Sequence, residues 1–65
     1  MLDVEQAMLA EQFAALLAKE REAEKACAEL LESIGDLNAR RELQQIHREK
    51  VRHVQLVERL LEIVE

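Results

Sequence analysis

A single short segment interrupts a sequence that otherwise favours helix along its whole length. The segment reads Ser-Ile-Gly-Asp-Leu-Asn at positions 33–38, and it holds the only glycine of a 65-residue chain that has no proline. The flanking sequence is rich in alanine, leucine, glutamate and lysine, which lose little free energy on entering a helix. We therefore predict one helix over about residues 3–34, a turn at 35–38 and a second helix over about residues 39–64.

The residues of this turn predict how the two helices are joined. Gly35 follows the expected end of the first helix, where a glycine commonly takes the left-handed backbone conformation. Asp36 is a preferred N-cap, because its side chain accepts a hydrogen bond from a backbone N–H of the following helix. Since the connection is short, we expect the two helices to lie antiparallel and side by side.

Apolar residues recur in alternating steps of three and four along both predicted helices, which is the heptad pattern of helices that pack at a shallow angle. In the first helix the predicted seam comprises Leu2, Gln6, Leu9, Phe13, Leu16, Glu20, Ala23, Cys27, Leu30 and Ile34. In the second helix it comprises Ala39, Leu43, Ile46, Lys50, His53, Val57, Leu60 and Val64. We expect these two seams to face each other within the hairpin.

A second apolar line runs beside each seam. A pair of helices covers only one seam, so the second line would remain in water, and monomers rarely expose an apolar patch of that length. We therefore predict an all-α fold in which an antiparallel two-helix hairpin dimerises into a four-helix bundle. The predicted dimer interface comprises Leu17, Leu31, His47, Val51, Val54 and Leu61.

Three polar residues occupy the middle of the predicted seams. Antiparallel pairing about the turn places Glu20 opposite His53, and it places the small Ala23 opposite Lys50. A buried charge costs several kcal/mol unless it is paired and hydrogen-bonded, so we expect Glu20, Lys50 and His53 to form a buried polar cluster. In a symmetric dimer, two carboxylates and two ammonium groups balance with neutral imidazoles, so this cluster needs no metal.

Composition restricts the classes of function. A net charge of −5 argues against a nucleic-acid or anionic-membrane partner. A single cysteine excludes an internal disulfide and a four-thiolate zinc site. We find neither a basic leader nor an apolar run of about 20 residues, so we expect a soluble, cytoplasmic protein. Ser33 is the only hydroxyl residue, so no set of nucleophile, base and acid exists and we expect no catalytic residues.

Residues 20–64 resemble one helical hairpin of the ferritin-like superfamily, in the style of rubrerythrins and small encapsulated ferritins. In those families the first helix carries a glutamate, an alanine three residues later and an aromatic residue seven residues later. Glu20 and Ala23 match this motif, whereas Cys27 replaces the aromatic residue.

The second helix of those families carries Glu-x-x-His, often as Glu-Glu-x-x-His. Glu49 matches the leading glutamate and His53 matches the histidine, but Lys50 stands at the ligand position. The resemblance implies that Glu20 and His53 are iron ligands in the family, where ferrous iron is oxidised by dioxygen or peroxide. An ammonium group repels a divalent cation and can neutralise Glu20 instead. We therefore expect a ferritin-like frame in which an internal cation replaces the metal.

The leading functional hypothesis is a self-associating hairpin without a cofactor, which has a structural or protein-interaction role. The first alternative is a ferritin-like protein that binds or oxidises iron, or binds another divalent metal, through Glu20 and His53 with help from Glu49 or Glu24. Its activity would be ferroxidase-like. Glu49 and His53 are four residues apart and so share a helix face. The second alternative is an adaptor that binds a helix of another protein along the second apolar line.

Overall fold

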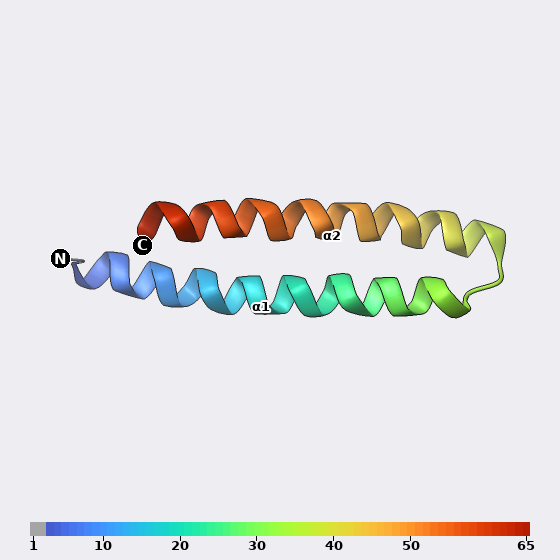
Figure 1. Ribbon diagram of the computed structural model, residues 1–65, viewed down its shortest axis with the longest axis horizontal. Coiled ribbons are helices and arrows are strands. Elements are labelled where there is room, and N and C mark those ends of the chain that lie inside the picture. The colour runs from blue at the N-terminus through green and yellow to red at the C-terminus, as the bar shows by residue number, and fades with distance from the viewer. Residues whose placement is uncertain (1–2) are drawn as a thin grey trace.

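The computed structural model describes residues 3–65 and consists of two antiparallel helices joined by a short turn (Figure 1). Helix α1 spans Val4–Ser33 and helix α2 spans Leu37–Val64. The start of α1 and the end of α2 lie at the same end of the molecule (Figure 1). No strand occurs among the described residues. The predicted helical hairpin is therefore confirmed, although α2 begins at Leu37 rather than near residue 39.

Aspartate side chains cap the N-termini of both helices. The Oδ1 atom of Asp36 accepts a hydrogen bond from the backbone N–H of Ala39 at 2.8 Å, as predicted. Asp3 does the same for Gln6 at 2.7 Å at the start of α1. Each cap satisfies one of the backbone donors that the first helical turn leaves without a partner.

The end of α1 differs from the prediction. No described residue has a positive φ, so Gly35 does not take the left-handed conformation and that expectation was wrong. Ile34 instead leaves the helix in an extended conformation. The guanidinium of Arg40 donates through Nη1 to the carbonyl oxygens of Leu31 and, at 3.2 Å, of Ile34. A side chain of α2 thus satisfies carbonyl groups that a glycine-based cap would otherwise pair.

The contact with Arg40 lies on the face of α2 that packs against α1. Arg40 lies on one heptad line with His47, Val54 and Leu61, and this line is half-buried. The guanidinium reaches the end of α1 from this line. On α1 the matching line contains Leu17, which is buried.

The predicted seams are therefore only partly correct. A middle line of the predicted seams is buried or half-buried, and Leu9 and Ala23 beside it are half-buried as well. The middle line comprises Gln6, Phe13, Glu20, Cys27, Ile34, Leu43, Lys50, Val57 and Val64. The outer residues of the predicted seams are 41% to 52% exposed: Leu16, Leu30, Ile46 and Leu60. In their place the hairpin buries or half-buries the line on the other side of the middle line, which contains Leu17 on α1 and His47 on α2. Leu2, also assigned to a seam, lies outside the described residues.

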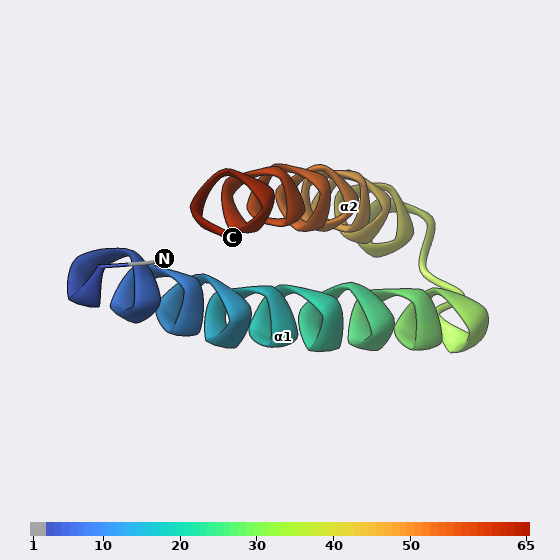
Figure 2. The ribbon, with the colours of Figure 1, turned by 60° about the vertical axis from the view of Figure 1, so that its left-hand side comes forward.

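The hairpin is a thin rod with a small core. It measures 52 × 13 × 12 Å, and its radius of gyration is 15.2 Å, compared with about 11 Å for a compact chain of this length. Two views 60° apart agree that α1 and α2 lie side by side along the rod (Figures 1 and 2). The buried apolar residues are Leu17, Val57 and the free thiol of Cys27, which packs as a small hydrophobe. Within residues 3–65, neither helix is long and apolar enough to cross a membrane.

Substituting Arg40→Ala tests the cap between the helices. We expect the free energy of unfolding to fall by about 1–2 kcal/mol, because two carbonyl groups lose a charged donor. The measurement is urea denaturation followed by circular dichroism at fixed protein concentration. The matched control is Arg41→Ala, which removes an exposed neighbour and should change stability by less than about 0.5 kcal/mol. Equal losses in the two variants would contradict the capping role.

Candidate functional site

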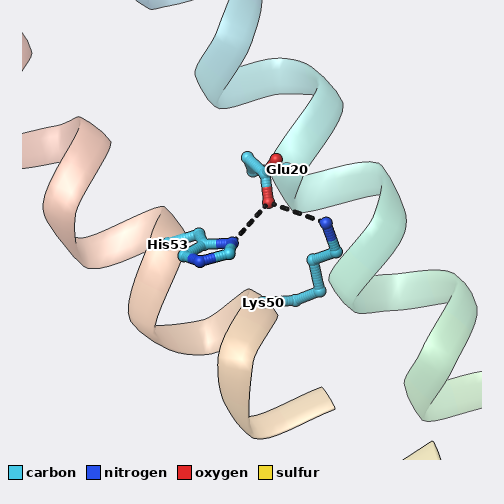
Figure 3. A network of polar contacts seen from close by, with 3 residues as sticks. All are labelled: Glu20, Lys50 and His53. Atoms are coloured by element: carbon cyan, nitrogen blue, oxygen red, sulfur yellow. Dashed lines mark ion pairs between the residues drawn. The ribbon is translucent and has the colours of Figure 1, made fainter. Parts of the chain in front are cut away.

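Halfway along the hairpin, Glu20 of α1 meets Lys50 and His53 of α2 (Figure 3). The Oε2 atom of Glu20 lies 3.4 Å from Nζ of Lys50 and 3.5 Å from Nδ1 of His53. Both nitrogen atoms approach the same carboxylate oxygen. The structure thus brings together the three residues of the polar cluster that the sequence predicts.

The polar cluster is half-buried in the single hairpin rather than buried. The side chains of Glu20, Lys50 and His53 are 18%, 30% and 49% exposed, respectively. No polar or charged residue among the described residues is fully buried. Two helices present only one contact surface, and they cannot exclude water from the outer side of a charged group between them. The predicted burial of the cluster is therefore not reached within one chain.

One atom of the cluster is nevertheless withdrawn from solvent. Oε2 of Glu20 is buried and accepts no hydrogen bond, although two nitrogen atoms lie within ion-pair distance of it. These two observations are compatible, because the attraction of an ammonium for a carboxylate acts without the alignment that a hydrogen bond requires. A buried acceptor without a hydrogen bond costs about 1–3 kcal/mol, which the attraction of Lys50 offsets.

A second contact lies one helical turn away. Nε2 of His47 is 3.6 Å from Oε1 of Glu24, and both side chains are partly exposed. His47 therefore faces α1 within the hairpin. From the sequence, Glu24 is predicted only as a ligand of a possible metal site, and its pairing with His47 is not predicted. This pairing was predictable from the sequence, because Glu24 and His47 lie at nearly equal sequence separations from the turn.

The residues predicted for the dimer interface belong to the contact between α1 and α2. Leu17 is buried within the hairpin, and the remaining five are half-buried: Leu31, His47, Val51, Val54 and Leu61. An interface between two copies stays a prediction. The apolar side chains that are open to such a contact are different from those that the sequence assigned to it.

The alternative metal site is not assembled within one hairpin. No group of three or more histidine, cysteine, aspartate or glutamate side chains gathers within residues 3–65 in a way that could hold a metal ion. Oε1 of Glu49 accepts a hydrogen bond from Nε2 of Gln45 along the surface of α2. Of the proposed ligands, Glu20 and His53 lie within ion-pair distance of each other, and the ammonium of Lys50 competes with any cation for the Glu20 carboxylate.

Comparison with known proteins gives no match, because no family model fits the chain and no curated protein or solved structure is significantly similar to it. The ferritin-like resemblance thus depends on the motif residues alone and stays a prediction.

A double-mutant cycle with Glu20→Gln and Lys50→Met measures the attraction within the polar cluster. We expect a favourable coupling of about 1 kcal/mol, because both side chains are mostly shielded from water. The measurement is urea denaturation of the wild type, both single variants and the double variant.

The control for this cycle is the exposed ion pair between Arg21 and Glu58, which lie 3.7 Å apart across the same two helices. Replacing both residues by glutamine should give a coupling below about 0.5 kcal/mol. If the two cycles gave equal coupling, the central position of Glu20 and Lys50 would have no energetic significance.

Proposed function

We propose that the chain is a self-associating structural or interaction module, in which two hairpins pack face to face into a four-helix bundle. The polar cluster of Glu20, Lys50 and His53 fixes the register of this bundle. The observation that carries the proposal is the amount of surface, much of it apolar, that a single hairpin leaves open.

The accessible surface of the hairpin is too large for a compact monomer. It amounts to 5157 Å², whereas the usual scaling gives about 4,200 Å² for a chain of 7.5 kDa. The excess is roughly 900 Å², and each partner in a standard protein–protein interface buries about 800 Å². One face of one hairpin therefore offers the area that a specific dimer requires.

The energy of this burial is of the same order as the cost of enclosing the two charges that each chain contributes to the cluster. Burying about 800 Å² per chain, of which more than half is apolar, contributes on the order of 10 kcal/mol before the cost of association. Desolvating a paired charge costs several kcal/mol. Once enclosed, Glu20 and Lys50 would disfavour any shift along the bundle axis, because a shift would place a charge against an apolar layer.

Sedimentation of the purified chain tests self-association. We expect a mass at least twice the 7.5 kDa of one chain. We also expect the thermal unfolding midpoint to rise with protein concentration, because association stabilises only the folded state. A monomeric mass and a midpoint independent of concentration would contradict the proposal. An adaptor for the helix of another protein would behave in that way.

A second candidate function is iron binding through Glu20 and His53. The observation that favours it is the buried Oε2 atom of Glu20, which accepts no hydrogen bond and lies beside an imidazole nitrogen. Oxygen and imidazole ligands of this kind suit iron, provided that further carboxylates are supplied. Stoichiometric iron, manganese or zinc in the purified wild-type protein would favour this candidate over a metal-free cluster.

Substituting Lys50→Glu tests whether the frame can hold iron. The change removes the competing cation and adds a carboxylate three residues before His53. We expect the variant to bind ferrous iron under anaerobic conditions more tightly than the wild type does, as measured by titration calorimetry. The matched control is Lys50→Met, which removes the cation without adding a ligand and should show no such gain. No gain for Lys50→Glu would argue against a ferritin-like frame.

A further inference from the structure

One flank of the hairpin is apolar along nearly its full length. We name it the open flank, and it consists of one line of every seventh residue on each helix. On α1 the line comprises Leu9, Leu16, Ala23 and Leu30, and on α2 it comprises Ala39, Ile46, His53 and Leu60. Two further exposed residues of α2, Leu56 and Ile63, lie three or four positions from Leu60 and extend the same side.

The two lines lie on the same side of the hairpin. Each of their residues directly precedes a residue of the line that packs against the partner helix. Leu16 precedes Leu17 on α1, and Ile46 precedes His47 on α2. The residues that directly follow the middle line mark the opposite flank, where Arg21 of α1 pairs with Glu58 of α2 across the helices. In an antiparallel pair, equivalent flanks of the two helices meet. The pairing of Arg21 with Glu58 therefore locates the two apolar lines together on the other side.

A second copy of the chain is the occupant that fits the open flank. The two lines of the open flank carry no aspartate, glutamate, lysine or arginine, and Glu42 and Glu49 occur only on the neighbouring line of Leu56 and Ile63. The opposite flank carries an ion pair. A copy of the hairpin supplies an equally apolar surface of matching length. The excess area of each hairpin equals what one partner of a standard dimer buries. A partner of another kind would need an apolar face as long as the 52 Å rod.

Two symmetric arrangements make this contact, and the charges of the helices distinguish them. Helix α1 holds seven glutamates and three cationic residues, whereas α2 holds four glutamates and six cationic residues. A two-fold axis along the rod stacks α1 of one copy on α2 of the other, with both turns at the same end. An axis across the rod stacks each helix on its own copy, with the turns at opposite ends.

The apolar contact is similar in both arrangements, so charge decides between them. Stacking α1 on α2 brings an acidic helix against a basic one twice in each dimer, whereas the alternative brings like against like. Each exposed pair contributes only a few tenths of a kcal/mol, but charge patterns of this kind set orientation more than affinity.

We propose that the open flank is the interface with a second copy of the chain, and that the two hairpins pack with α1 on α2 and with their turns at the same end. This inference rests on the proposed self-association and specifies its face and its orientation.

The face is tested with two lysine substitutions on α2 in the full chain. Ile46→Lys places an ammonium in the open flank, and Val51→Lys places one on the opposite flank, at one residue of the interface that the sequence predicts. We expect Ile46→Lys to raise the dimer dissociation constant by about 100-fold or more, and Val51→Lys to raise it less than about tenfold. Sedimentation gives both constants, and circular dichroism checks that each variant remains helical.

The outcomes separate this inference from the proposed function. A monomeric wild-type protein would overturn both. A dimeric wild type that Val51→Lys dissociates as readily as Ile46→Lys would overturn the face but leave self-association intact. If neither substitution dissociates the dimer, the face is likewise overturned and self-association remains intact.

The orientation is tested by the distance between two spin labels at Gly35. A cysteine is accommodated there, because a Cβ atom would meet nothing within 4 Å and the backbone φ is not positive. The variant carries Cys27→Ala as well, so that Gly35→Cys is the only labelled site. Turns at the same end would place the two labelled backbone positions about 10 Å apart, given the usual spacing of packed helices, so the labels would lie well within about 25 Å of each other. A distance near the 52 Å length of the hairpin would overturn the orientation.

Discussion

The guanidinium group of Arg40 closes the C-terminus of α1 and joins the end of that helix to the first turn of α2. The same face of α2 packs against α1 along the rod, because every seventh residue after Arg40 is half-buried, as His47 is beside Glu24. The residues that directly precede this line, such as Ile46, lie on the outside. The apolar side chains that remain open along α2 therefore belong to the line next to that of Arg40.

A second constraint comes from charge at the middle of the rod. Glu20 lies on the line shared by both possible seams, so it faces α2 whichever neighbouring line is buried with it. Lys50 and His53 approach one of its oxygen atoms from α2. Two helices leave this cluster partly in water, which keeps the cost of desolvation low in the single hairpin. In the proposed bundle, a second hairpin on the open flank would cover His53, which is the most exposed residue of the polar cluster.

The sequence predicts the parts of this structure that arise from local chemistry. Helix composition, the short connection and the Asp36 cap define the hairpin, and antiparallel pairing about the turn brings Glu20, Lys50 and His53 together. Periodicity does not determine which two of three adjacent apolar lines pack together, because all three have the same seven-residue spacing. In the structure the buried lines include that of Arg40, whose guanidinium donates to two carbonyl groups of α1, and no repeat in the sequence encodes this choice. Gly35 suggested a glycine cap, but the arginine made one unnecessary.

The two caps of the turn have a consequence for how the chain reaches its folded state. Asp36 and Arg40 are close in sequence, and together they join the end of α1 to the start of α2. Contacts between the helices can then form in order from this junction outward, and each new pair closes only a slightly longer loop than the one before it. Closure of this kind proceeds within microseconds, whereas the meeting of two chains depends on how dilute they are. In the proposed dimer, the speed of assembly would therefore depend on the encounter of two molecules more than on the folding of each one.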